Sequence, residues 1–550
     1  MQQQQIKRRV VAVDISNQGG LFALDQAESA VATVAATTVK PALRFNDPDP
    51  QALRINALSL EEFLKNSGQR APLRIRQFLS TLSFVEFEAA YAPGGRPPYA
   101  PRAMVGVILS GLMQGINSLR ELEQFARVNL GCWWVSGAIM PDHSILGRFI
   151  QRHDELLRAG FFEQLVRQVL KVTHSGTSVV AGDGTVIEAA ASRYRLLRAE
   201  ALQTALDEAR AKAATEPNPR RLKRIARLEQ AKAVLDQRRQ ARQDHGKDPR
   251  TVSIHPQESD AVVQPQKDQR YAAAYKPSVL ANSMRVILAC ELHASSETSV
   301  VPALLDTAKQ HGSIDTALFD AGYCASEIFT TMRDRHIEFL CPEGNSRSDD
   351  WNKHSDKQFP KSRFVYLADQ DSYRCPNQQL LTPVSRYQGN ASAPSYVAYG
   401  TTACSECPLQ QNCTRSATGR TIKRYVIDTE KDALRLKMTD PAVRERYKKR
   451  QAMVEPVFAQ LRGVQGLRRF HRSGLAGARL EFALHALAYN LGRVLARAVF
   501  IVRAAATSML DSLLRWKKTS ANQIGHRIAF NALYAVTRSV RTAKLHGCRC

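Results

Sequence analysis

Apolar residues recur at helical spacing along the first third of the chain. The pattern covers residues 58–172, where a proline-rich loop at 93–101 opens into an apolar run at 103–113. A helical domain is therefore expected there. Residues 1–57 mix Gln, Ala, Thr and Val without a clear period, and we expect them to form a weakly ordered arm.

The end of this helical region carries a pattern typical of DNA-binding proteins. A predicted helix at 118–128 is followed by a tryptophan segment and a turn at 141–143, which leads into a second helix that Asp142 or Ser144 can cap. The second helix bears Arg148, and two such helices with a tight connection suit a helix-turn-helix that reads a DNA groove. An ordinary helical bundle with a basic face fits the same spacing.

From residue 173 onward the pattern alternates between strands and helices. A short apolar run at 177–181 leads to Asp183, and another at 316–319 ends at Asp320. The remaining elements are strands expected at 278–281, 284–292 and 337–340 and helices expected at 301–310 and 326–335. This alternation predicts an α/β sheet domain, built from residues 173–192 and 251–341, with both aspartates at one edge of the sheet.

A basic insertion interrupts this domain. Residues 193–250 contain sixteen Lys or Arg and eight acids, in two helical stretches broken at residues 216–219. This composition indicates an inserted helical hairpin. It is either an arm that contacts phosphates or a solvated spacer.

A second insertion, at residues 342–420, contains four cysteines. They are Cys375, Cys404, Cys407 and Cys413, with a C-x2-C pair at the centre. Four thiolates at such spacing can bind a structural Zn²⁺, which would hold together a segment rich in Pro, Ser and Gln with little core of its own. Four reduced thiols in a loosely packed insertion are the alternative.

Residues 444–472 set Glu455 within a dense field of Lys and Arg. In a helix, Lys448, Glu455 and Arg462 share one face because they lie seven residues apart. Pro456 predicts a kink at Glu455. The stretch is either part of a site that presents an acid beside phosphate-binding cations or a solvated basic helix whose acid relieves repulsion. We assign residues 421–506 to the last part of the α/β domain and residues 507–550 to a basic tail.

The charge balance points to a polyanionic partner. Lys and Arg number 77 against 51 acids, which gives a net charge of +26, and nucleic acid is the first candidate. A membrane surface is the competing polyanion, but no apolar run reaches the roughly 20 residues that span a bilayer. The N-terminus lacks the pattern of a signal peptide and ten cysteines give no disulfide density, so we expect a cytoplasmic, nucleoid-associated protein.

Asp183, Asp320 and Glu455 form a set with a definite chemistry. Two aspartates from adjacent strand ends and a glutamate from a packed helix can bind hard divalent cations, because Mg²⁺ or Mn²⁺ takes oxygen ligands. Two such ions would activate an attacking water or 3′-hydroxyl and stabilise the leaving oxygen in a phosphodiester displacement. For each aspartate taken singly, a simple strand-end cap is the more common role.

Several short motifs, in a fixed order over about residues 92–493, resemble bacterial insertion-sequence transposases of the DDE class, specifically the group called the IS eleven-eighty-two family. The N-terminal motifs, similar to that family's InsH-like module, are RPPY at 96–99, GINSLRELE at 115–123, and PDHS at 141–144 followed by Arg148-Phe149. The catalytic motifs are DGT at 183–185, DAGY at 320–323, YKKR at 447–450, VEPVF at 454–458 and GLRRF at 466–470. Their combination in this order is far more specific than any one of them.

The resemblance implies an RNase H-like catalytic domain in which Asp183, Asp320 and Glu455 bind the catalytic metal. It also places Tyr447, Arg450 and Arg462 where these enzymes carry an accessory Tyr, Arg and Lys. Arg462 replaces the usual Lys, which keeps the charge and changes the donor geometry. The motif at 466–470 adds Arg468 and Arg469 as DNA-binding candidates, and similar cysteines occur in the family at the position of the predicted zinc site.

The function expected from this resemblance is DNA transposition. The enzyme would bind the terminal inverted repeats of its element as a homodimer or larger synaptic assembly, cleave the DNA strands and transfer the 3′-hydroxyl ends to double-stranded target DNA. The alternative is a catalytically silent descendant that binds the repeats and represses. A zinc hydrolase is disfavoured, because four thiolates leave no open coordination position for water.

Overall fold

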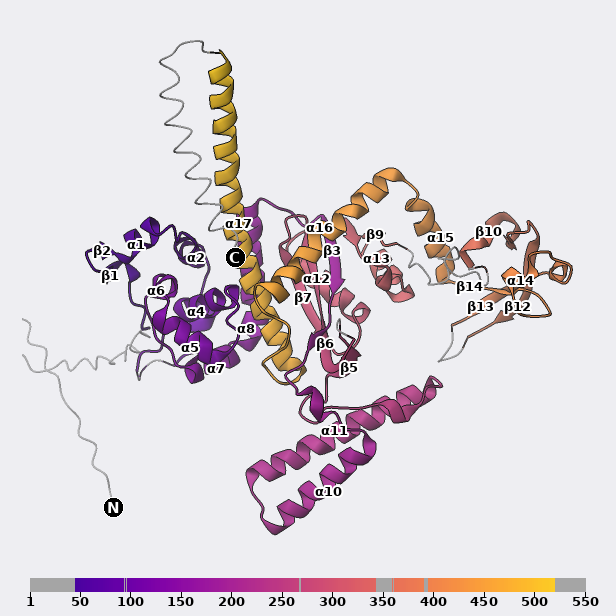
Figure 1. Cartoon of the computed structure of the whole chain (residues 1–550), viewed down its shortest axis with the longest axis horizontal. Coiled ribbons are helices and arrows are strands. Elements are labelled where there is room, and N and C mark those ends of the chain that lie inside the picture. Colours follow the sequence, from indigo (N-terminus) through magenta and orange to yellow (C-terminus); the bar gives the residue numbers. More distant parts are fainter. Residues whose placement is uncertain are drawn as a thin grey trace, which may run out of the picture.

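A computed structural model describes residues 45–92, 94, 96–266, 269–342, 359, 361–389 and 394–519, with side chains described up to residue 496. Among these residues, no helix combines the length and the apolar character needed to cross a membrane. The chain forms a helical bundle, a mixed α/β domain, a projecting helical hairpin and a small antiparallel sheet (Figure 1).

The N-terminal bundle packs around one buried helix, α4 (Pro101–Met113), in which Ala103–Leu112 are all buried. The other helices of the bundle are α1 (Leu60–Asn66), α2 (Ala71–Leu79), α3 (Val85–Glu88), α5 (Leu119–Val128), α6 (Leu130–Ser136), α7 (His143–Arg152), α8 (Asp154–Arg158) and α9 (Gly160–Thr173). Ser59 and Ser118 begin α1 and α5 with reciprocal capping boxes, which satisfy N–H groups that have no partner within the helix.

The two helices predicted as a helix-turn-helix are α5 and α7, and a third helix lies between them. Asn129 ends α5 and at once caps α6, since its side chain accepts a hydrogen bond from the Cys132 N–H at 2.8 Å. Asp142 caps α7. Although α5 and α7 pack on each other, the tight connection expected from the sequence is replaced by α6 and a loop.

A seven-stranded mixed sheet forms the α/β domain. Its central strand β3 (Val179–Gly184) pairs in parallel with β8 (Thr316–Leu318), which pairs in parallel with β9 (Glu338–Leu340). On its other side β3 pairs antiparallel with β6 (Tyr271–Asn282), which also pairs antiparallel with β4 (Ile187–Glu188), β5 (Val262–Pro265) and β7 (Ile287–His293). Most of β6 is buried, because helices including α12 (Val301–Lys309) and α17 cover the sheet.

The long helix α17 (Gly474–Thr519) joins the bundle to the sheet. It contacts α4, α8 and α9 and also β7 (Figure 1), and its residues 480–491 are all buried. At its centre the buried Asn490 side chain accepts a hydrogen bond from the Ile287 N–H at 2.9 Å and donates one to the Ile287 carbonyl at 2.8 Å. The helix extends past residue 506, where the sequence analysis ended the α/β domain, to Thr519.

Both insertions form compact units. Helices α10 (Ala199–Thr215) and α11 (Pro219–Asp244) build the hairpin around a core that includes Leu202, Leu206, Leu228 and Leu235. The cysteine segment forms an antiparallel sheet of β10 (Val365–Leu367), β11 (Ser372–Arg374), β12 (Leu380–Tyr387), β13 (Tyr396–Gly400) and β14 (Ile422–Tyr425). It has its own aromatic core, including Phe364, Tyr373 and Tyr399, so the expectation of little core is wrong.

The described end of the N-terminal arm, residues 45–57, packs on the bundle. Asp49 caps a short 3-10 turn, Asp47 forms an ion pair with Arg102 at 2.7 Å, and Phe45 lies edge-on against Tyr91. The sequence pattern missed these contacts because they are tertiary and have no period. The rest of the arm, residues 1–44, and the tail from 520 lie outside the described residues.

Candidate active site

Asp183 and Asp320 occupy equivalent positions on neighbouring parallel strands. The register pairs Ala181 of β3 with Leu318 of β8, and each aspartate follows two residues later. The carboxyl ends of the two strands therefore place both side chains at one edge of the sheet, as the sequence predicted. This edge is where ligands usually bind in α/β sheets.

Local packing keeps the two aspartates in place. Gly182 precedes Asp183, and the Phe319 ring lies against it so closely that an added Cβ would be 2.1 Å from a ring carbon. The Asp183 carboxylate accepts a hydrogen bond from the Gly184 N–H at 3.0 Å, and Asp320 accepts one from the Gly322 N–H at 2.9 Å. Only glycine at position 182 allows the two strand ends to come this close.

Helix α16 (Pro441–Gly463) crosses this edge of the sheet and brings Arg450 between the aspartates. A guanidinium nitrogen of Arg450 lies 3.2 Å from one Asp183 oxygen, 3.9 Å from one Asp320 oxygen and 3.3 Å from the Gly182 carbonyl. One turn earlier, the Tyr447 hydroxyl donates to the Phe319 carbonyl at 3.1 Å, and burial raises its pKa to about 12. Both accessory residues therefore contact the strand ends that carry the aspartates.

The protonation of Asp183 is shifted toward the neutral acid. Burial raises the pKa of Asp183 to about 6, and Asp320 and Glu297 add to the increase. Arg450 and the Gly184 N–H act in the opposite direction without cancelling it. A carboxyl group buried beside other carboxylates binds a cation favourably, because the cation removes both the burial penalty and the repulsion.

Glu455 lies on the same helix and is exposed. Its carboxylate accepts a hydrogen bond from the Gln451 side chain at 3.0 Å, one helical turn away. Among the described residues, no three His, Cys, Asp or Glu side chains come together to hold a metal ion, so the three predicted ligands are not gathered in this structure. Asp183 and Asp320 meet around Arg450, and Glu455 stays apart from them on α16.

The kink predicted at Glu455 does not interrupt α16, which continues through Pro456. Proline has no N–H to donate to the carbonyl four residues earlier, that of Ala452. The Arg285 side chain supplies the missing donor, with its Nε 2.9 Å from the Ala452 oxygen. A tertiary contact from the turn between β6 and β7 thus satisfies the group that Pro456 leaves open.

Glu297 is an acid near the site that sequence reasoning missed. Its side chain lies against Gly184, next to Asp183, and forms an ion pair with Lys276 at 3.4 Å. Burial raises the pKa of the Tyr323 hydroxyl, and the charges of Glu297, Asp183 and Asp320 raise it further, so all three acids act on the same buried group. No motif pointed to Glu297, because it belongs to a turn and reaches the site only through the fold.

The remaining predicted DNA-binding residues spread over two parts of the molecule. Arg462 donates to the carbonyl of Val186, just after β3, and Arg469 donates to the Ala189 carbonyl at 3.2 Å. Arg468 is exposed between them, so these arginines extend from the aspartates toward an open hollow lined by Tyr194, Arg270, Arg469 and His471. Arg148 is exposed on α7 in the bundle, away from this group.

The carboxylate pair fits a divalent metal. Both side chains offer oxygen ligands. A cation, the Arg450 guanidinium, already lies between them, 3.2 Å from an Asp183 oxygen and 3.9 Å from an Asp320 oxygen. Ligand chemistry, charge and partial burial therefore all suit Mg²⁺ or Mn²⁺ at Asp183 and Asp320.

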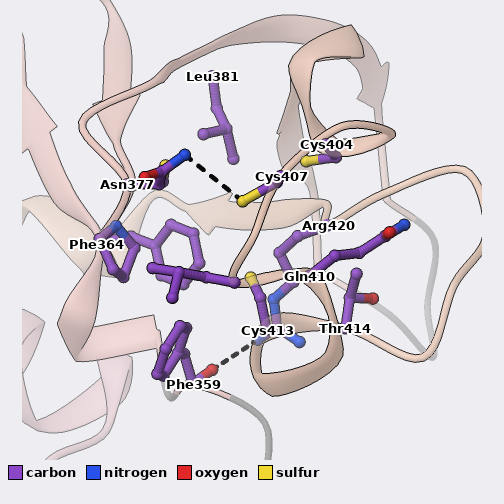
Figure 2. A pocket seen from close by; sticks show the side chains of 13 residues that line it. Phe359, Phe364, Asn377, Leu381, Cys404, Cys407, Gln410, Cys413, Thr414 and Arg420 are labelled. Atoms are coloured by element: carbon purple, nitrogen blue, oxygen red, sulfur yellow. Dashed lines mark hydrogen bonds between the residues drawn. The ribbon is translucent and has the colours of Figure 1, made fainter.

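The four predicted cysteine ligands line a single pocket in the small sheet domain (Figure 2). The Asn377 side chain donates to the Cys407 sulfur at 3.6 Å, and Cys404 and Cys407 face the pocket from one tight turn. Burial raises the pKa of Cys413, and Cys404, Cys375 and Cys407 raise it further while Arg420 lowers it. The four cysteines therefore share one pocket, and thiolates are ligands that Zn²⁺ prefers, but the described sulfurs are not gathered closely enough in this structure to form a metal site.

Two parts of the chain match known family models. Residues 374–495 match the model described as "Transposase DDE domain", and residues 61–152 match the one described as "Transposase domain (DUF772)". No curated protein matches the chain. The first match includes Glu455 and all four cysteines and begins after Asp183 and Asp320.

The DDE domain match relates residues 374–495 to a family of phosphoryl-transfer enzymes, for which an RNase H-like fold is implied, and the mixed sheet with its acidic edge is of the kind such a domain carries. The chain thus combines a transposase N-terminal domain with a transposase DDE domain, and at the level of the family this implies DNA binding and transposition.

Proposed function

We propose that this protein is an active transposase of the IS eleven-eighty-two group, which cuts DNA at the terminal inverted repeats of its element and joins the freed 3′-hydroxyl ends to target DNA. One observation carries the proposal: two register-matched aspartates flank the arginine of a helix that also bears Glu455 and lies within the DDE match. The bundle with exposed Arg148 would recognise the repeats, and two or more copies would assemble on the paired ends.

Asp183 and Asp320 would hold the metal, and Glu455 would complete its ligand set. A divalent ion bound there supplies Lewis-acid activation of the nucleophile and stabilisation of the leaving oxygen. Because Glu455 is exposed and Gln451 is its only hydrogen-bond partner among the described residues, a change of its side-chain rotamer is enough to release it from that contact.

The basic residues of the site would position the DNA backbone. Arg450 compensates the charge of the carboxylates before the metal binds and can turn to a phosphate afterwards, since its guanidinium carries five donors in a planar fork. Tyr447 fixes the end of β8 through the Phe319 carbonyl, and Arg462, Arg468 and Arg469 offer cations along one path away from the cleavage point. Together they would align the scissile phosphate with the nucleophile.

Cleavage of a labelled duplex containing the transposon end in Mg²⁺ tests the proposal. Asp183→Asn, Asp320→Asn and Glu455→Gln should each abolish cutting and leave DNA binding within about threefold, because each loses a charged metal ligand and keeps its size. Glu327→Gln, which changes an exposed acid close to Asp320, should cut normally. If the unchanged protein binds the ends and never cuts, the silent repressor replaces the transposase.

We also propose that the four cysteines bind one structural Zn²⁺. Metal analysis should find one zinc per chain, lost in Cys404→Ser and kept in Cys290→Ala, a cysteine outside the cluster. Removing zinc with a chelator should unfold the small sheet, which is measured by its proteolysis. Loss of DNA cleavage with this sheet still folded would instead indicate a hydrolytic role for zinc.

A further inference from the structure

The cations of α11 divide into two groups. Of its nine Lys and Arg residues, five have partners within the protein: Arg221 with Glu216, Lys232 with Gln203, Arg238 with backbone carbonyls, Arg239 with Asp236 and Arg242 with the Asp248 carbonyl. The other four are Arg220, Lys223, Arg224 and Arg227. They are all exposed, and no described residue pairs with them.

These four residues form a single stripe, which we call the α11 track. They follow the spacing i, i+3, i+4 and i+7, so all four lie on one side of the helix. Like charges at these spacings repel each other by about 0.2–0.5 kcal/mol per pair, and no acid of the hairpin relieves the repulsion. The track therefore does not stabilise the hairpin, and its charges stay available to a ligand.

The anchor of the hairpin fixes the direction in which the track faces. Arg238, later on α11, donates to the carbonyls of Ser259, Asp260 and Ala261 in the α/β domain at 2.9–3.0 Å. Arg220 and Arg227 precede it by 18 and 11 residues, which are whole numbers of helical turns to within about 20°. The track thus continues the side of α11 by which the hairpin holds the α/β domain.

The position and length of the hairpin suit a DNA duplex. It begins shortly after β4, which follows Asp183 by a few residues, and projects from that end of the sheet (Figure 1). Its helix α11 has 26 residues and is about 39 Å long, slightly more than one turn of duplex DNA at about 34 Å. The track itself covers about 10 Å, or about three phosphates of one strand.

We propose that the α11 track, near the tip of the hairpin, binds the phosphate backbone of double-stranded DNA at a distance from the cleavage point, independently of base sequence. The inference rests on the proposed function, because it assigns the hairpin to the same DNA that reaches Asp183. The four side chains would contact phosphates and not base edges. The affinity they add should therefore depend on the salt concentration and not on the base sequence.

Binding to a random-sequence duplex of roughly 30 base pairs, measured by fluorescence anisotropy over a series of salt concentrations, tests the inference. The variant R220Q/K223Q/R224Q/R227Q removes the track, and glutamine retains helical propensity. The control K212Q/K232Q/K247Q/R250Q removes four cations elsewhere on the hairpin. Circular dichroism verifies that both variants are folded.

A plot of log affinity against log salt concentration has a negative slope. We expect this slope to become less steep by about 2.7 in the track variant, because three phosphate contacts are lost, and by less than about 1 in the control. Equal slopes in the two variants would overturn the inference, and would leave the proposed function standing if both still cut transposon ends in Mg²⁺. The inference would also be overturned if the track variant bound the duplex as the unchanged protein does and lost binding only to anionic phosphatidylserine vesicles. Failure of the unchanged protein to bind any duplex would refute the proposed function itself.

Discussion

At the scale of single residues, the site depends on how closely the strand ends approach. Gly182 lets the Phe319 ring lie against β3, and this close packing brings together the ends of β3 and β8, which carry Asp183 and Asp320. Arg450 can therefore reach both aspartates. The same packing buries Asp183 enough to raise its pKa to about 6. A glycine with no chemistry of its own therefore determines the geometry of the acids beside it.

Gly182→Ala should lower both stability and cleavage. The new methyl group overlaps the Phe319 ring, and overpacking of this kind typically costs about 1–3 kcal/mol. Urea unfolding measures the loss. Gly463→Ala is the control, since an added Cβ there meets no atom within 4 Å and lies in a helix that favours alanine. Equal stabilities of the two variants would show that the ring does not restrict this position.

At the scale of elements, α16 is held across the sheet by polar contacts along its length. Near its start, Glu338 of β9 forms ion pairs with Arg446 of α16 and Lys437 of α15 (Ile427–Lys437), and it accepts a hydrogen bond from Thr316 of β8. Further along, Arg285 satisfies the carbonyl that Pro456 leaves open. These contacts let a helix rich in positive charge stay regular over the acidic edge.

The Glu338 cluster predicts a loss of stability in acid. Burial alone would raise the pKa of Glu338, but the hydrogen bonds from Lys437, Arg446 and Thr316 outweigh it and lower the pKa to about 2, below the usual value near 4.5. The stabilisation is complete above about pH 4.5 and is lost as the pH falls toward 2. Unfolding measured between pH 5 and 2 should therefore depend less steeply on pH in Glu338→Gln, and an unchanged pH profile would contradict this account.

At the scale of the whole molecule, α17 couples the helical bundle to the α/β domain. Its buried stretch, residues 480–491, lies between the bundle and β7, so the bundle cannot move far from the α/β domain without breaking this packing. The hairpin and the small sheet have separate cores and attach at other points (Figure 1).

Asn490→Leu should weaken this coupling. The substitution leaves the Ile287 N–H and carbonyl buried without their side-chain partner, which costs at least about 2 kcal/mol in the free energy of unfolding. Chemical unfolding measures the loss, and limited proteolysis between the bundle and the sheet should become faster. Ala476→Leu, on the exposed first turn of α17, should stay within about 0.5 kcal/mol of the unchanged protein.

The sequence predicted those features that local pattern encodes. The strands leading to Asp183 and Asp320, the helices over 301–310 and 326–335 and the paired helices of the hairpin all occur within a few residues of their expected bounds. Their periodicity and capping residues are properties of short segments. The two aspartates could be placed at one sheet edge because parallel strands end on the same side.

What the tertiary structure alone decided concerns groups that meet from distant parts of the chain. The contact between Arg450 and both aspartates, the approach of Glu297, the rescue of the Ala452 carbonyl by Arg285 and the core of the cysteine domain leave no periodic signal in the sequence. The sequence by itself determined which residues could do phosphate chemistry, because residue type sets charge and ligand preference. Only the fold decided which of them lie together, because distance in space does not follow distance along the chain.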